Sequence, residues 1–277
     1  MRRIGKWTLV LLCLMPAGAS GQWAQGGFGK LWVKTAAFLQ QTDMRFDVNG
    51  DKVPWLGGVG ESDARALYTD IIVGLHKRVD LWVQVPFFDL RFQDATSDLQ
   101  TVGFGDIRAW IRWQFAQLGG TALALRAGAK APIGDSPLDA QIIPVGEGQW
   151  DLEGFAEVGH SFWPVPAYAE LWLGYRKRFE DDESRRQPGD EVVFLAEAGI
   201  NPTASTFLKT TLDGFRGDNF TVEGVETQNK REITNLQFSG AVRIGRFWPE
   251  FGVRIPLAGR EFPAGVQYVF GVSATLR

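Results

Sequence analysis

The chain has 277 residues, a formal net charge of −3 and 45% hydrophobic residues. The sequence has no basic patch of the kind that binds nucleic acid. No stretch beyond the N-terminal region holds some 18 consecutive apolar residues, which excludes a helical membrane protein. The single cysteine, Cys13, lies close to the N-terminus, so the remaining chain has no disulfide and no thiol chemistry. We expect no cofactor and no metal.

The N-terminal residues have the pattern of a secretory signal peptide. Arg2, Arg3 and Lys6 precede the apolar stretch 7–15, and small residues follow it. We expect residues 1–21 to be cleaved and residues 22–277 to form one domain. Removing these three positive charges changes the formal net charge from −3 to −6.

Beyond this segment, stretches in which polar and apolar residues alternate recur along the whole chain. A period of two predicts β-strands, because successive side chains leave a strand on opposite faces. The predicted strands are 31–40, 64–76, 81–92, 104–115, 121–133, 150–162, 169–178, 191–200, 206–215, 233–244, 250–257 and 266–276. Long and short links take turns between them, which is typical of outer-membrane barrels and not of soluble sandwiches. The sequence therefore predicts an all-β fold, a transmembrane antiparallel up-and-down β-barrel of about 12 strands.

The alternation is clearest in the hairpin 149–179. Leu171 and Leu173 lie on one face, whereas Glu170 and Arg176 lie on the other, within the strand rather than at its ends. In a soluble sandwich the charged face would meet solvent. In a membrane barrel the apolar face meets lipid and the charged face lines the lumen. The sorting of the links favours the barrel.

Extending the alternation around the chain predicts a lumen with acidic and basic residues on neighbouring strands. The candidates for the lumen or a constriction are Arg108, Arg112, Arg126, Lys130, Glu153, Glu157, Glu170, Arg176, Glu197 and Arg243. We expect Arg126 and Lys130 beside Glu153 and Glu157, and these beside Arg176. Two interpretations remain open. The charges form either a ladder that fills and rigidifies the barrel or a polar constriction that selects solutes.

Aromatic residues near the predicted strand ends indicate an interfacial girdle, because amphipathic rings settle at the level of the lipid headgroups. The girdle candidates are Trp150, Trp163, Trp172, Tyr175 and Trp248. An aromatic platform inside the lumen is the alternative for Trp110 and Trp172.

The sequence does not favour an enzyme. His76 and His160 are its only histidines, and His160 and the adjacent Ser161 leave one strand on opposite faces, so they cannot share a proton. The stretch 47–51 resembles the start of a calcium loop but lacks the distal glutamate, so we predict a turn.

Several short motifs follow one another along the chain: GFGDI at 103–107, KAPIG at 130–134, PVGEGQWD at 144–151 and GYRKRF at 174–179. In this order they resemble the outer-membrane family named for the MetA-pathway (meta-pathway) of phenol degradation. The resemblance implies a bacterial outer-membrane barrel that takes up small, often hydrophobic or aromatic, compounds. The chain differs from such barrels at its C-terminus, where Leu276-Arg277 replaces the usual aromatic residue.

Together these features predict a channel or transporter in the bacterial outer membrane for passive uptake of small, hydrophobic or aromatic solutes. The expected partners are outer-membrane lipid, the solute and the barrel assembly machinery, but not nucleic acid. A structural or plugged barrel without transport is the alternative, and a barrel hydrolase is a third.

Overall fold

The computed structural model describes residues 27–137, 139 and 141–276. The predicted signal peptide, residues 1–21, lies outside this range. The described chain is built from strands, with one short 3-10 helix at Trp55–Gly57. None of its helices is long and apolar enough to cross a membrane.

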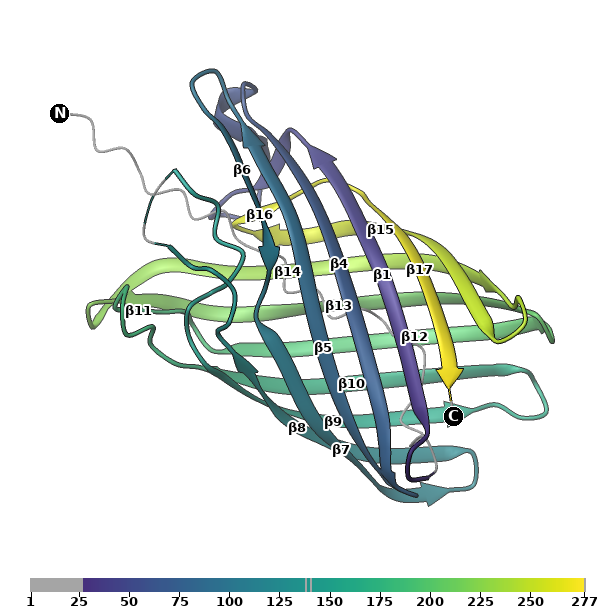
Figure 1. The fold of residues 1–277 in the computed structure, drawn as a ribbon. Helices are drawn as coiled ribbons and strands as arrows, with labels where there is room; N and C mark the ends of the chain where they lie inside the picture. Colours follow the sequence, from purple (N-terminus) through teal and green to yellow (C-terminus); the bar gives the residue numbers. More distant parts are fainter. Residues whose placement is uncertain (1–26, 138, 140, 277) are drawn as a thin grey trace.

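Twelve long strands form a closed antiparallel barrel in which neighbours in the chain are neighbours in the sheet. In order they are β1 (Leu31–Thr42), β4 (Glu61–His76), β5 (Val79–Gln93), β7 (Ile107–Leu118), β8 (Thr121–Ala131), β9 (Asp151–Ser161), β10 (Ala167–Arg178), β12 (Glu191–Thr203), β13 (Thr206–Val222), β14 (Val225–Val242), β15 (Phe247–Arg260) and β17 (Gln267–Leu276). Pairing of β17 with β1 closes the barrel. Strands of facing walls cross at a large angle, as expected for tilted barrel strands (Figure 1). This confirms the predicted fold class.

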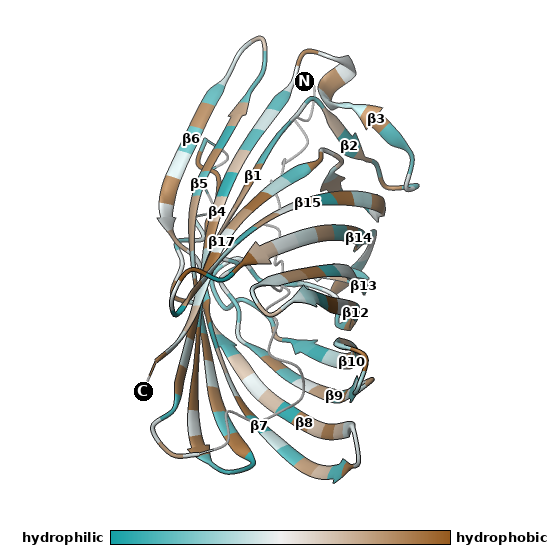
Figure 2. Ribbon diagram, turned by 90° about the vertical axis from the view of Figure 1, so that its right-hand side faces the viewer, coloured by the Kyte–Doolittle hydropathy of each residue, from teal (hydrophilic) through white to brown (hydrophobic). Residues whose placement is uncertain are grey.

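Short additional strands extend one end of the barrel. β6 (Asp98–Phe104) continues the line of β7 along β5 beyond an interruption at Gly105 and Asp106. β2 (Met44–Phe46), β3 (Lys52–Pro54) and β16 (Phe262–Pro263) form a small separate sheet, and β11 (Arg186–Gln187) pairs with β13. Figure 2 shows β2, β3 and β6 projecting beyond the barrel wall.

The two ends of the barrel differ in the length of their links. At one end the links are short turns, such as Lys77-Arg78, Gly119-Gly120 and Ala204-Ser205. The other end carries the long links 43–60, 132–150 and 179–190, which include the short strands β2, β3 and β11. The predicted polar loop after residue 215 is instead a continuation of β13 and β14, which turn only at Glu223-Gly224. Both faces of this extension are polar, so no alternation marked it as strand.

The strands place apolar side chains outside and polar ones inside. On β10, Glu170 and Arg176 are 5% and 2% exposed, whereas Leu171 and Leu173 are 50% and 57% exposed. A lipid-facing apolar band around a polar interior is the arrangement of transmembrane barrels.

Candidate functional site

The interior is built around carboxylates that are each shared between basic residues of neighbouring strands. Glu153 on β9 accepts hydrogen bonds from Arg108 Nε at 3.1 Å, Trp110 Nε1 at 2.7 Å and Arg176 Nε at 2.7 Å. Arg176 lies opposite Glu153 in the antiparallel register and also pairs with Glu191 on β12. These charge-assisted hydrogen bonds join the inner walls of β7, β9, β10 and β12.

Arg126 occupies a box of aromatic rings at the middle of the barrel. Its Nε lies 2.6 Å from Glu157 Oε1. The guanidinium carbon lies over the ring centroids of Phe155 at 4.3 Å, Trp172 at 4.4 Å, Trp82 at 4.6 Å and Trp110 at 5.3 Å. Cation–π attraction is strongest for such desolvated groups. The guanidinium is therefore held by both a carboxylate and the ring faces.

A second ionic group lies on the wall formed by β12, β13, β15 and β1. Lys209 Nζ is 3.1 Å from Glu197 Oε2 and 3.8 Å from Glu250 Oε1, and Lys34 Nζ is 2.6 Å from Glu250 Oε2. Glu170 lies opposite Glu197 in the register of β10 and β12, and its buried Oε2 accepts no hydrogen bond. Two carboxyl groups thus adjoin each other within this group.

The last part of the long link between β8 and β9 folds into the barrel. Ile143 and Val145 are 3% and 2% exposed and belong to a buried cluster with Tyr68 on β4 and Phe88 on β5. A Cβ at Gly146 would lie 2.2 Å from Gly134 O, so only glycine permits this close approach of the two loop segments. We call residues 143–149 the inward loop.

Glu147 of the inward loop connects distant walls of the barrel. Its Oε2 lies 2.8 Å from Lys130 Nζ on β8, and its Oε1 lies 2.6 Å from Arg178 on β10 and 3.5 Å from Arg231 on β14. Burial alone would raise the pKa of Glu147, but the charges of Arg178, Lys130 and Arg231 hold it well below its usual range. The loop is therefore fixed by an ionised carboxylate.

The interior is packed at its central level. Asp70 and Thr211, which lie on different walls, are both 0% exposed, and Trp110 and Arg254 are 2% and 1% exposed. Such burial leaves no open water-filled passage beside these side chains. Side chains therefore fill the interior at this level.

A cavity of about 570 Å³ lies at the end with the short links. Its walls include the aromatic residues Trp32, Tyr168, Phe207 and Trp248. The ion pair between Lys34 and Glu250 also lines it. A mainly apolar cavity with a few polar groups is the usual form of a small-molecule site. We call this cavity the vestibule.

The structure brings together nine of the ten predicted lumen candidates. Arg108, Arg112, Arg126, Lys130, Glu153, Glu157, Glu170, Arg176 and Glu197 are buried on the inner face. Arg126 pairs with Glu157 and Arg176 pairs with Glu153, as expected from the sequence. Lys130 pairs instead with Asp106, Asp151 and Glu147. That these residues line a conducting path remains a prediction.

Arg243 lies elsewhere. β14 ends at Val242, and Arg243 starts the turn to β15, where its N–H donates to Ser205 O at 2.8 Å and its Nε donates to Gly245 O at 3.1 Å. Its side chain is exposed. The placement of Arg243 in the lumen is wrong, because the alternation of faces applies only within a strand.

Trp172 also differs from its expected place in the aromatic girdle. It is 2% exposed and points into the barrel, where it contacts Arg126. Trp150 and Tyr175 are 55% and 50% exposed, as an outer girdle requires, whereas Trp163 and Trp248 line the vestibule. Trp172 fits the alternative of an interior aromatic residue.

Sequence reasoning missed several interior groups. Asp70 accepts hydrogen bonds from Trp82 Nε1 and Gln84 Nε2, both at 2.9 Å, and Asp80 pairs with Arg112 at 2.7 Å. The same alternation on the first strands would have placed Asp70 and Asp80 inside. No local pattern indicates that Glu147, which lies in a link, enters the lumen.

His160 and the carboxylate of Asp47 make local contacts. His160 is exposed on the outer face, where its Nδ1 lies 2.8 Å from Thr121 Oγ1. The carboxylate of Asp47 caps its own turn by accepting hydrogen bonds from the N–H groups of Asn49 and Asp51 at 2.8 and 2.9 Å. Within the described residues, no group of three or more histidine, cysteine or acidic side chains could hold a metal ion.

No protein-family model and no curated protein matches the chain. Among solved structures, the fold is similar to that of the COG4313 outer membrane channel from Pseudomonas putida F1, with a TM-score of 0.75 and 16% identity over 94% of this chain and 100% of that one. It is also similar to the NanC porin, with a TM-score of 0.52 and 7% identity over 89% of this chain and 100% of that one.

The beta domain of the Bordetella autotransporter BrkA is a further match, with a TM-score of 0.50 and 10% identity over 90% of this chain and 100% of that one. At these identities the likeness concerns the fold. These neighbours, the closed twelve-stranded barrel and its apolar outer face place the protein in the bacterial outer membrane.

Proposed function

We propose that the protein is a passive channel for small solutes across the outer membrane. The observation that carries this proposal is the set of buried ion pairs on several inner walls, such as Arg126–Glu157, Arg176–Glu153 and Lys209–Glu197. Buried ion pairs add little net stability compared with apolar packing, so a purely structural interior does not need them. Rings of fixed charge are, in contrast, a common means of selecting solutes in pores.

In this proposal the inward loop closes the end of the channel that carries the long links, in addition to the side chains packed at the central level. Its Glu147 holds Lys130 and Arg178 together, and its Ile143 and Val145 fill the space beside Phe88. Release of the loop would open the end of the barrel that carries the long links. The likeness in fold to an outer-membrane channel supports this role.

The solutes in this proposal are small and hydrophobic or aromatic. The vestibule supports this class, because Trp32, Phe207 and Trp248 offer ring faces to a solute that leaves the barrel. In this proposal the N-terminal signal directs export of the chain, and the barrel assembly machinery inserts it into the outer membrane.

Planar-bilayer conductance and liposome swelling test the proposal. We expect purified protein to show discrete conductance steps and to admit small aromatic alcohols faster than sugars of similar mass. An equal rate for both solutes would contradict the aromatic preference. Absence of conductance and swelling, also after release of the inward loop, would contradict the channel itself.

Ion selectivity provides a separate test. Replacing Glu153 and Glu157 together by glutamine leaves Arg108, Arg126 and Arg176 without these carboxylates, so the pore should shift toward anions. Reversal potentials under a salt gradient measure the shift. Glu183→Gln is the control, because Glu183 is exposed in the link 179–190. Unchanged selectivity in the double variant would show that these charges do not line the path.

A structural barrel without transport is the second candidate function. The packed central level, with Asp70 and Thr211 at 0% exposure, favours it. It would hold if neither the wild-type protein nor variants of the inward loop conduct.

A further inference from the structure

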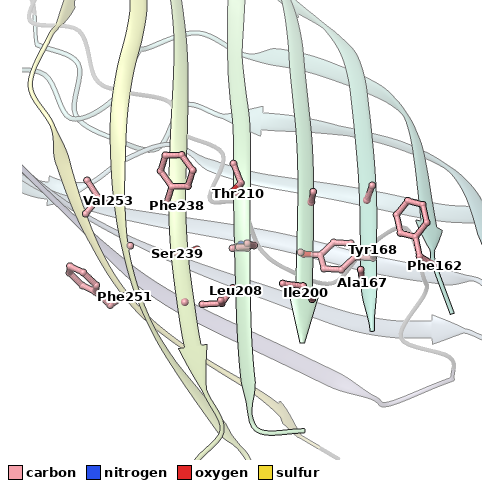
Figure 3. A pocket seen from close by; sticks show the side chains of 16 residues that line it. Phe162, Ala167, Tyr168, Ile200, Leu208, Thr210, Phe238, Ser239, Phe251 and Val253 are labelled. Carbon is pink, nitrogen blue, oxygen red and sulfur yellow. The ribbon is translucent and has the colours of Figure 1, made fainter. Parts of the chain in front are cut away.

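The outer face of the barrel carries an apolar groove of about 780 Å³. It crosses β10, β12, β13, β14 and β15 near the ends that carry the short links. Figure 3 shows Phe162 on one side of it and Phe238 and Phe251 on the other, with the shorter side chains of Leu208 and Thr210 between them. The groove therefore opens toward lipid, outside the ionic interior.

Small outward residues create the depression. Ala169, Ala198 and Gly240 form part of its lining. A Cβ added at Gly240 would lie 3.0 Å from Leu208 Cδ2 and 3.7 Å from Phe207 O, so a larger residue at this position would push against Leu208. A shallow apolar depression between aromatic side chains suits an extended, flexible hydrocarbon chain.

Two exposed arginines lie in the turn that follows β14, beyond the residues that line the groove. Arg243 and Arg246 belong to the turn between β14 and β15, and the Arg246 guanidinium lies 5.2 Å from the ring centroid of Phe247. Trp163, in the neighbouring link between β9 and β10, is 83% exposed. Exposed tryptophan and arginine at strand ends mark the level of the lipid headgroups. Gly240 and Arg243 are three residues apart, which is about 10 Å of strand.

We propose that the groove binds one phospholipid, with an acyl chain along Ala198 and Gly240 and the phosphate at Arg246 and Arg243. Arginine matches a phosphate through two parallel hydrogen bonds, and the groove excludes water from the acyl chain. A second copy of the chain would instead need a broad complementary surface of about 1,000 Å² or more. This binding does not depend on whether the barrel conducts.

Native mass spectrometry of the purified barrel with added phosphatidylglycerol tests the proposal. We expect one lipid to stay bound to the wild-type protein. Ala198→Leu fills the groove and should weaken retention about tenfold. It should still fold, because an outward leucine suits the lipid-facing surface, and heat-modifiable gel mobility checks this.

Matched variants separate the acyl and phosphate contributions. Ala127→Leu adds the same bulk at an exposed position of β8 outside the groove, and should leave retention unchanged. The double variant Arg243→Gln, Arg246→Gln should weaken phosphatidylglycerol but not diacylglycerol, which has no phosphate. Arg78→Gln, in the exposed turn between β4 and β5, should affect neither lipid.

Unchanged retention in Ala198→Leu would overturn the acyl site. Equal weakening by Ala127→Leu would show unspecific lipid binding and would overturn it as well. A dimer that is lost in Ala198→Leu, without any bound lipid in the wild-type protein, would assign the groove to a second copy.

Discussion

At the scale of single residues, the two faces of one strand tolerate different substitutions. Leu173 on β10 faces lipid and is 57% exposed, whereas Glu170 faces the interior and is 5% exposed. Leu173→Arg should destabilise the inserted barrel by about 2–4 kcal/mol if it lies near the bilayer midplane. Glu170→Gln should fold normally or better, because it removes one of two adjoining carboxylates. Heat-modifiable gel mobility measures both effects, and equal damage would refute the assignment of faces.

The aromatic box makes Arg126 and Glu157 strongly dependent on each other. Arg126→Met leaves a buried carboxylate without its partner and should cost about 3–5 kcal/mol of unfolding free energy. The double variant Arg126→Met, Glu157→Gln should recover much of this loss, because no uncompensated charge remains. Denaturant unfolding in detergent micelles gives the coupling energy. If the losses of unfolding free energy in the two single variants simply add in the double variant, the aromatic box and not the ion pair holds Arg126 in place.

At the scale of elements, the charge of Glu147 links the inward loop to three strands. Glu147→Gln removes the contacts with Lys130, Arg178 and Arg231, so the loop should leave the barrel and conductance should rise. Single-channel recording measures this rise. Glu183→Gln should have no effect. A Glu147→Gln variant with wild-type conductance would show that the loop does not close the path.

The pKa of Glu147 also predicts how the loop responds to acid. A carboxyl group whose pKa is lowered by folding stabilises the folded state above its unfolded pKa of about 4.3, and loses this contribution only as the pH falls through the lower folded value. Acidification from about pH 7 to about pH 5 should therefore leave the loop closed. Opening in this range, seen as a rise in conductance, would contradict the ionised state of Glu147.

The sequence predicted the elements better than the site. The period of two placed all twelve barrel strands, because a charged residue such as Arg112 beside apolar neighbours has only one acceptable face in a lipid-exposed strand. It misplaced Arg243, where β14 has already ended. It could not reveal the inward loop, because the contacts of Glu147 and Val145 join segments that are distant in the chain and follow no local period.

At the scale of the whole molecule, link lengths predict which end of the barrel faces the medium. An epitope inserted at Glu223-Gly224 or at Asp182-Glu183 should bind antibody on intact cells. One inserted at Ala204-Ser205, a short turn at the opposite end, should bind only after the cells are permeabilised. Labelling of Ala204-Ser205 on intact cells would invert the topology.

The aromatic box has an optical consequence for the whole barrel. Trp82 makes edge-to-face contacts with Trp110 at 5.5 Å and with Trp172 at 5.8 Å between ring centroids. These three buried tryptophans are among the 11 of the chain, and their contribution to the emission depends on the polarity at the barrel's centre. Water that entered when the interior opened would shift their emission to longer wavelengths. The protein thus carries an intrinsic fluorophore at the level where solutes would have to pass.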